Sequence, residues 1–467
     1  MLAYILVIMS VVSIILLSII QFIVSQVKYS SYNSYRGEAF QIAESGVYFY
    51  RWYLAHNTEG KTAVQIDNFW KSSPLGVGDI YEAEYDDPEG GAVGKYQLEV
   101  TPPSKGSTVV EVKSTAWTYK YPEAKRIIKV RYRKPSWSEY AVLGDDYTRF
   151  GSGTNVYGKI FANNGVHFDG VIHNIVSSAV NSYYDSDSDV RATKPGVWTS
   201  WTDEYNTDMS SDVFLSGKKY PIATKDFSSV YADFNIMKAE AVRTGNYYDD
   251  SGDGRYIILK GNTYDIRKVN GHSSNNNAPK FLDHDEWSLN NPIPEDGVIF
   301  VEDNIWLEGT LGTAETGQRL TVVAANLKTG NQPSVFIGND INYYNNQHDG
   351  NNILGIVAED NIEIIKDSQN ILNIDGALLA QKGRVGREYY TVGCWCGNSS
   401  CEDHKDTITV NGAIASGERY GFSWLDSCSR NTGYTNRNIY FDNNLLYYPP
   451  PYFPTGSQYL LDLWEEL

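Results

Sequence analysis

The sequence predicts an α+β protein in which a long N-terminal helix and a small antiparallel sheet precede a large all-β domain. Three observations lead to this fold class. An uncharged apolar run opens the chain and passes into a stretch with helical spacing. Three strand-like runs follow between Gly60 and Pro135, and a short apolar–polar–apolar pattern then recurs almost to the end. This recurrence predicts that the all-β domain is a parallel β-helix.

The composition of the first residues predicts the helix. Met1 to Val24 contains no charged residue, no Gly and no Pro. About 24 residues at 1.5 Å each extend roughly 36 Å, which is enough to cross a bilayer. The run lacks the basic n-region and the small-residue cleavage site of a secretory signal. We therefore expect it to be retained as a transmembrane or filament-core segment.

The helix is expected to continue to about residue 54, because an apolar stripe follows the uncharged run. The stripe consists of Phe40, Ala43, Val47, Tyr50 and Leu54. Their steps of three and four residues place them on one helical face, which needs a partner. Strand-like runs at 96–101, 108–117 and 126–133 can cover that face as a small antiparallel sheet.

A short apolar–polar–apolar pattern predicts the architecture of the rest. It occurs at Ile160–Val166, Val301–Ile305, Val323–Leu327, Val357–Ile362, Leu379–Val385 and Ile414–Gly417. Positions 301 and 323 are 22 residues apart, as are 357 and 379, whereas the intervening steps are longer. A coil of about 22 residues with inserted loops fits a right-handed parallel β-helix. The alternative, a β-sandwich, would repeat about every 8–12 residues.

These patterns divide the chain into four expected parts. They are an N-terminal helix (1–55, with 1–24 in a membrane or filament core), a sheet head (56–135), a β-helix domain (136–445) with a looser inserted lobe at about 172–290, and a C-terminal tail (446–467). The net charge of −18 argues against a nucleic-acid partner, because phosphate binding needs a cationic face.

Four cysteines lie in one short stretch. They are Cys394, Cys396, Cys401 and Cys428. An even, clustered set in an exported protein predicts two disulfides, and two connectivities remain open because Cys394 and Cys396 are too close to pair easily. The alternative is a metal site, since the C-x-C-x4-C-x2-H spacing ends at His404. The spacing departs from the common C-x2-C knuckle, which favours disulfides.

A second candidate site is the loop that holds Asp249, Ser251 and Asp253, followed by Gly254. Oxygen ligands at alternate positions before a glycine are typical of a Ca²⁺-binding loop. Lys260 occupies the position where an EF-hand has Glu, which excludes a complete EF-hand. A polar turn before a strand is the alternative, and we expect no other cofactor.

No catalytic site is predicted. The dense carboxylate groups are Asp283 to Glu286 and the pair Glu302 and Asp303. Neighbours on a strand point to opposite faces, so such pairs are poor candidates for two carboxylates facing one gap. The sequence has no G-x-S-x-G, H-E-x-x-H, Walker or C-x-x-C-H motif. We therefore expect a protein that is not an enzyme.

One segment after the apolar run resembles a known family. Ala39-Phe40-Gln41-Ile42-Ala43-Glu44-Ser45-Gly46 is similar to the A-F-x-A-A-E-[AS]-G segment of PilX-type minor pilins, within the type IV pilin-like superfamily. The resemblance implies that a leader is removed just before the apolar helix. It also implies that this helix sits in the membrane and later packs into a filament core. The helix residues concerned are Met1, Leu2, Tyr4, Ile5, Leu16, Ile20 and Phe22.

Two positions distinguish the chain from major pilins. Ile5 stands where most major pilins have Glu, and Phe22 stands near the position of a helix-breaking Pro in the best-known ones. PilX-like proteins also tend to lack that Glu. The departures therefore favour a pilin-like protein over an ordinary major pilin.

Two further segments resemble large uncharacterised pilin-like proteins of bacteria. Val156 to Gly170 is similar to their "GPVHSNGGIRFDG" stretch, and Tyr448 to Pro454 to their ending. The resemblance implies a subunit of a type IV pilus-like extracellular filament, or its minor or tip component. Its partners would be copies of itself, other pilins, the inner membrane before assembly, and a glycan or other surface ligand of an adhesive outer domain. The alternative is a membrane-anchored surface carbohydrate-binding protein, or a polysaccharide-active enzyme, that does not polymerise.

Overall fold

The computed structural model divides the chain into two compact units. The helical unit comprises Met1–Lys134 and Ser457–Leu467, and the long-sheet unit comprises Pro135–Gly456. The structure describes residues 2–61, 63–87, 90–104, 107–203, 205, 207–227, 231–250, 252–274, 276–282, 286–295, 297–328, 330, 332–390, 403–425, 431–456 and 458–467.

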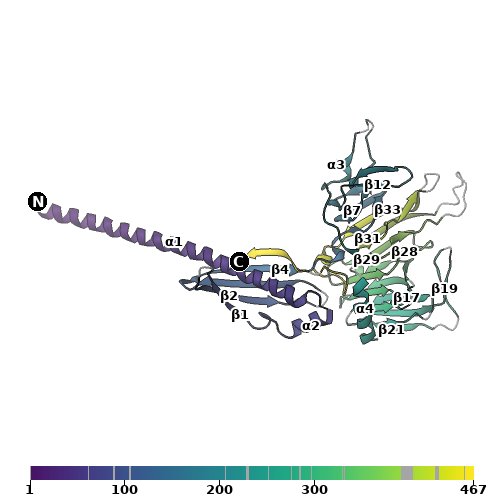
Figure 1. Ribbon diagram of the computed structural model, residues 1–467, viewed down its shortest axis with the longest axis horizontal. Coiled ribbons are helices and arrows are strands. Elements are labelled where there is room, and N and C mark those ends of the chain that lie inside the picture. The colour runs from purple at the N-terminus through teal and green to yellow at the C-terminus, as the bar shows by residue number, and fades with distance from the viewer. Residues whose placement is uncertain are drawn as a thin grey trace. The chain divides into compact units, whose positions relative to one another are not determined.

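The helical unit is one long helix packed on a small antiparallel sheet (Figure 1). Its elements are α1 (Leu2–Thr58), α2 (Ala63–Lys71), β1 (Tyr81–Asp86), β2 (Ala92–Thr101), β3 (Val110–Thr118), β4 (Tyr121–Arg133) and β34 (Leu460–Glu466). The strands pair in the order β1-β2-β3-β4-β34. The predicted helix and antiparallel sheet are therefore confirmed.

The apolar stripe of α1 faces this sheet. The buried residues of α1 are Ala39, Ile42, Ala43, Gly46, Val47, Tyr50, Leu54 and Thr58. They pack against alternate residues of the central strands, such as Leu98, Val112 and Val130, which are all buried. The hydroxyl of Tyr132 donates a hydrogen bond to the carbonyl of Val47 at 2.9 Å and ties β4 to the helix. Of the predicted stripe, Phe40 alone is only half-buried.

The last residues differ from our expectation of a C-terminal tail. Leu460–Glu466 form β34, which pairs antiparallel with β4 at the edge of the small sheet. Asp462 forms ion pairs with Arg131 (2.7 Å) and Arg133 (3.2 Å). The strand was missed because its partner lies more than 300 residues earlier, and because its apolar residues do not alternate cleanly. The long-sheet unit is thus inserted between two neighbouring strands of the small sheet.

The long-sheet unit contains one long, mostly parallel sheet. Its strands are β5 (Val142–Gly144), β7 (Thr154–Tyr157), β8 (Ile160–Ala162), β10 (Val171–Ile172), β11 (Val176–Ser178), β15 (Lys218–Lys219), β16 (Tyr247–Tyr248), β17 (Gly254–Gly261), β18 (Thr263–Val269), β21 (Ser288–Pro292), β22 (Val298–Val301), β23 (Asn304–Leu311), β24 (Arg319–Ala324), β25 (Val335–Ile337), β26 (Ile341–Tyr343), β27 (Ile353–Ala358), β28 (Ile362–Ile364), β29 (Ile371–Ala380), β30 (Val385–Arg387), β31 (His404–Ser416), β32 (Ser423–Leu425) and β33 (Asn431–Phe441).

Smaller elements surround this sheet. They are β6 (Thr148–Phe150), β9 (Val166–Phe168) and β14 (Val197–Trp198) in one sheet, the pair β12 (Ser182–Asp185) and β13 (Ala192–Pro195), the pair β19 (Gly271–His272) and β20 (Pro279–Lys280), the helices α3 (Ser210–Val213) and α4 (Tyr231–Thr244), and short 3-10 turns at Trp137–Glu139, Tyr344–Asn346 and Asn443–Leu446.

The recurring sequence pattern marks one position of a ladder of paired strands. Parallel pairing aligns Val301, Ala324, Ala358, Ala380, Ser416, Gly144, Ala162 and Ser178 in that order. Each of these residues is the last residue of its strand. The predicted inserted lobe at 172–290 is not separate, because β10, β11 and β15 to β18 belong to this same sheet. The sequence did not predict that these strands join the long sheet, because they lack the recurring pattern.

The order of the ladder differs from the order of the chain. The first strand, β5, pairs with β31 on one side and with β8 on the other. Likewise β7 pairs with both β33 and β10. The chain therefore enters the ladder in its middle, extends to one end at β15, and resumes at the other end with β16 and β17.

Both faces of the central strands are buried, which explains their continuous apolar runs. In β27, Ile356 points to the larger core and Val357 to a second core on the opposite face. That second core is covered by α4, through Phe234, and by the segment from Leu445 to Phe453. The hydroxyl of Thr321 donates to the carbonyl of Pro451 at 2.5 Å and fixes the segment there.

Candidate functional site

The N-terminal half of α1 is an uncovered apolar surface. Every described side chain from residue 2 to residue 30 is exposed. Leu2, Tyr4, Ile5 and Phe22 are all more than half exposed, and Leu16 and Ile20 are each 55% exposed. By length and composition this helix can cross a membrane. Met1 lies outside the described residues.

The first described ring contacts between α1 and the small sheet occur at Tyr32 and Tyr35. Their rings lie 6.1 and 5.4 Å from the ring of Tyr121. Roughly 30 helical residues therefore precede the sheet, about 45 Å of helix at 1.5 Å per residue. Exposed apolar side chains on this scale mark a surface that is buried elsewhere, in lipid or against other helices.

The segment that resembles minor pilins is the contact between α1 and the sheet. Ala39, Ala43 and Gly46 are buried, whereas Phe40 and Glu44 are half-buried. A Cβ atom on Gly46 would lie 2.7 Å from Oγ of Ser114 and 2.9 Å from Cδ2 of Tyr96. Small residues are therefore required where the helix approaches the strands.

Phe40 also connects the helix to the last strand. Its ring lies edge-on to Trp464 of β34 at 5.7 Å, and the guanidinium of Arg126 lies over the same ring at 5.4 Å. These contacts give the motif a packing role in the helical unit.

The predicted cysteine site lies outside the described residues. This applies to Cys394, Cys396, Cys401 and Cys428. Their disulfides, and the metal alternative with His404, stay predictions.

The predicted Ca²⁺ loop is described in part. Asp249 lies 3.5 Å from Arg255, and Asp253 lies 3.5 Å from Nδ1 of His272. Ser251 lies outside the described residues, and among the residues that the structure describes Asp249 and Asp253 belong to no group of three His, Cys, Asp or Glu ligand atoms within 4.8 Å of one another. Calcium binding stays a prediction.

The carboxylates of Glu302 and Asp303 have different surroundings. Glu302 is fully buried and is held by Lys238, Lys328 and Tyr247. Burial favours its neutral form, but the hydrogen bonds from Lys238, Lys328 and Tyr247 outweigh burial and keep the pKa of Glu302 below its usual range. Burial raises the pKa of Asp303 to about 6. Of Asp283 to Glu286, only the exposed Glu286 is described.

A buried histidine cluster was missed from the sequence. His167 is fully buried, with Nε2 at 3.0 Å from Asp169 and Nδ1 at 3.3 Å from Asp185. Its ring stacks on Trp198 with centroids 3.8 Å apart. Ligand atoms of His167, Asp185 and Asp187 also lie within 4.8 Å of one another, which is close enough for a metal ion.

The charges around this cluster favour a structural role. Asp187 already pairs with Arg149 at 2.9 Å and with Arg419 at 2.5 Å, so a dication would meet two guanidinium groups. Burial opposes the charged form of Asp169, yet hydrogen bonds from His167 and Ser200 lower its pKa to about 2. The cluster links β9, β12 and the turn after β14. A lone His between apolar residues gave no signal that would have identified it.

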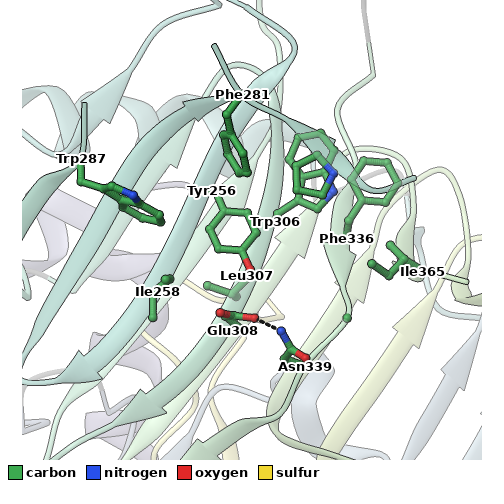
Figure 2. A pocket seen from close by; sticks show the side chains of 12 residues that line it. Tyr256, Ile258, Phe281, Trp287, Trp306, Leu307, Glu308, Phe336, Asn339 and Ile365 are labelled. Carbon is green, nitrogen blue, oxygen red and sulfur yellow. Dashed lines mark hydrogen bonds between the residues drawn. The ribbon is translucent and has the colours of Figure 1, made fainter. Parts of the chain in front are cut away.

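An aromatic cavity lies on the outward face of the long sheet (Figure 2). Parallel pairing aligns Tyr256 of β17 with Trp306 of β23, and Trp306 with Phe336 of β25. The same register places Ile258 beside Glu308. The cavity has a volume of about 320 Å³.

The wall of the cavity comes from the segment between β18 and β21. Phe281 and Trp287 stand edge-on to Tyr256, with centroids at 5.7 and 5.9 Å. The segment is anchored because Nε1 of Trp306 donates to the carbonyl of Asn277 at 2.8 Å. The sequence could not reveal this cavity, because its residues meet only through the strand register.

No known protein family matches the sequence, and no curated protein matches it. Among solved structures, the chain is similar to the competence-associated pilin ComZ from Thermus thermophilus. The two are 12% identical, and the similarity covers 93% of this chain and 97% of that one with a TM-score of 0.33. A TM-score this low does not establish a common fold.

Proposed function

We propose that the chain is a structural subunit of a type IV pilus-like extracellular filament, or a minor or tip component of one. The observation that supports this most is α1. Its first half exposes apolar side chains on all sides, and its second half is fixed to a small sheet. A helix of this kind can lie in the membrane before assembly and pack against other helices in a filament afterwards.

The partners would be further copies of this chain and other pilins. Exposed Leu16 and Ile20 lie in the middle of the apolar half, so each would be buried in a filament core. In this arrangement the long-sheet unit remains outside the core, where it serves surface display or adhesion. The pilin-like helix gives no reason to expect catalysis.

We also propose that the long sheet winds as a parallel β-helix. The ladder supports this, because positions 301, 324, 358 and 380 align through successive parallel pairs. The steps of 23, 34 and 22 residues each correspond to one coil, with an inserted loop in the second. The two strands that follow each other within a coil, such as β22 and β23, each have their own parallel partners in the next coil.

Filament assembly can be tested by placing a charge in the apolar half of α1. Leu16→Asp and Ile20→Asp should abolish filaments in cells that produce this protein, as seen by electron microscopy of shed material. An uncompensated carboxylate is costly when it is buried among apolar helices. Immunoblots of membrane fractions should still contain the full-length protein, because one charge in a long apolar helix costs insertion only about 3 kcal/mol.

Asn33→Asp is the matched control. Asn33 is exposed on the same helix but lies beyond the uncharged run, so filaments should form normally. Normal filaments with Leu16→Asp would contradict the proposal. Membranes that contain the parent chain while no filament contains it would favour the alternative of a membrane-anchored carbohydrate-binding protein or polysaccharide-active enzyme that does not polymerise.

A further inference from the structure

We propose that the aromatic cavity of the long-sheet unit binds a neutral carbohydrate, as one or two sugar residues of a glycan. Its biological use rests on the adhesive role proposed above, whereas binding itself needs no filament. The cavity combines flat aromatic surfaces with planar polar side chains, and both groups face the same space (Figure 2).

The rings provide two surfaces at right angles. The planes of Tyr256 and Trp287 are inclined at 87°, and those of Tyr256 and Phe281 at 77°. A sugar ring has an apolar face of C–H groups that can pack on one of these planes, with its edge against the other. Behind them, Trp306 and Phe336 are almost fully buried and stack on each other at 4.9 Å, so they form a rigid support.

The polar groups are placed for hydroxyl recognition. Glu308 and Asn339 lie at one side of the cavity, and the amide of Asn339 donates to the Glu308 carboxylate. Burial and the adjacent Glu308 carboxylate, to which the hydroxyl is hydrogen-bonded, raise the pKa of Tyr256. Carboxylate and amide groups can each engage neighbouring hydroxyls through two atoms. Asn339 is exposed, so it can exchange water for a ligand.

Charge argues against ionic occupants. The guanidinium of Arg267 already lies over Phe281 at 4.4 Å and within 5.9 Å of Trp287, so a cationic ligand would meet a positive group on the same rings. The Glu308 carboxylate opposes an anionic ligand. A neutral ligand with many hydroxyls is repelled by neither Arg267 nor Glu308.

Geometry argues against an extended peptide. Peptide strands commonly bind by pairing with a free sheet edge. Here the strands that form the floor are paired in register with each other from residue 254 to residue 261 and from 304 to 311, so the cavity lies on a sheet face. Its volume of about 320 Å³ lies at the small end of ligand sites, which are typically about 300–1,000 Å³.

The test is binding by the full-length chain in detergent. The probes are cellotriose, chitotriose, xylotriose and mannotriose, measured by quenching of tryptophan fluorescence and confirmed by sedimentation with the parent polysaccharides. We expect saturable binding of at least one probe. Trp287→Ala should weaken it at least fivefold, because the stacking surface is lost. Asn339→Ala should weaken it at least threefold through lost hydrogen bonds, and this exposed position leaves folding intact.

Trp52→Ala is the control, because Trp52 is an exposed tryptophan of α1 remote in sequence from the cavity and its removal should leave binding unchanged. The proposal is overturned if none of the four probes binds, or if binding survives both cavity variants unchanged. Binding of tetramethylammonium without binding of any sugar would also overturn it and would indicate a cation site. None of these outcomes bears on filament assembly, which the α1 variants test separately.

Discussion

Arg387 is a buried cation that holds a turn in place. Its side chain is fully buried, and Nη2 donates to the carbonyl of Lys366 at 2.9 Å and to Asp403 at 2.6 Å. Nη1 donates to the carbonyl of Ile365 and to Oγ of Ser368. One planar guanidinium therefore satisfies four acceptors in two buried and two part-buried hydrogen bonds, an arrangement for which a lysine has neither the reach nor the geometry.

We therefore predict that Arg387→Lys destabilises the long-sheet unit by about 2–4 kcal/mol, because several buried acceptors lose their donors. Urea unfolding of the full-length chain measures this. The control is Arg384→Lys, three residues earlier, where a partly exposed arginine pairs with exposed Glu388 and the expected change is below about 1 kcal/mol. Equal stability of the two variants would mean that the buried network contributes little.

The raised pKa of Glu363 leads us to predict that the stability of the long-sheet unit depends on pH. It is buried, and it accepts hydrogen bonds from Tyr390 at 2.5 Å and from Asn277 at 3.0 Å. Burial raises its pKa from 4.5 to about 7, so the folded chain keeps a proton that the unfolded chain has lost. This contribution to stability is fully present below pH 4.5 and is lost as the pH rises through about 7.

Glu363→Gln should therefore flatten the decline in stability between pH 4.5 and pH 8. Glutamine keeps an acceptor for Tyr390 and Asn277 but cannot ionise. The difference in the free energy of unfolding between the parent chain and Glu363→Gln should change by up to about 3 kcal/mol over this range. Asp303, whose pKa is also raised, is present in both proteins, so its contribution to the pH dependence cancels in the difference between them. Glu315→Gln at an exposed position is the control and should follow the parent chain. Parallel stability curves for the parent and Glu363→Gln would refute the assignment.

At the scale of the element, α1 depends on close approach to the sheet at one glycine. A Cβ on Gly46 would meet Ser114 and Tyr96 at less than 3 Å, whereas a Cβ on Gly37 of the same helix would meet nothing within 4 Å. The same substitution at these two positions therefore separates packing from helix propensity.

Gly46→Ala should destabilise the helical unit by about 1–3 kcal/mol through overpacking. Gly37→Ala should stabilise it by about 0.5–1 kcal/mol, because alanine favours the helix more than glycine does. Hydrogen exchange of the amides of β2 to β4, followed by mass spectrometry, localises both effects to this unit. An equal gain at both positions would show that the sheet can withdraw from Gly46.

The elements differ in how far the sequence predicted them. The helical spacing of Ala43, Val47, Tyr50 and Leu54 predicted the buried face of α1, because helix periodicity is a local property. The recurring pattern likewise predicted strand ends that align in the ladder. Strand pairing is not local, so β34 and the order of the ladder were missed. The aromatic cavity was missed for the same reason, since Tyr256, Trp306 and Phe336 meet only after the register is set.

At the scale of the whole molecule, the path of the chain makes the long-sheet unit an insertion. Its two ends meet, since the amide of Gly456 donates to the carbonyl of Pro135 at 2.7 Å and the amide of Trp137 donates to that of Pro454 at 3.1 Å. Strands from its beginning and its end are also neighbours, because β33 pairs with β7 and β31 with β5. The unit therefore closes on itself without a strand from the helical unit.

We predict that Pro135–Gly456 folds when it is expressed alone, because both of its cores and the pairing of its terminal strands lie within that range. Its near-ultraviolet circular dichroism should be native-like, and its melting temperature should lie within a few degrees of the matching transition of the full-length chain. The control fragment 135–425 lacks β33, so β31 and β7 lose their shared neighbour and cooperative melting should disappear. A Pro135–Gly456 fragment that binds a hydrophobic dye and shows no cooperative transition would indicate that the helical unit is needed to hold the ends together.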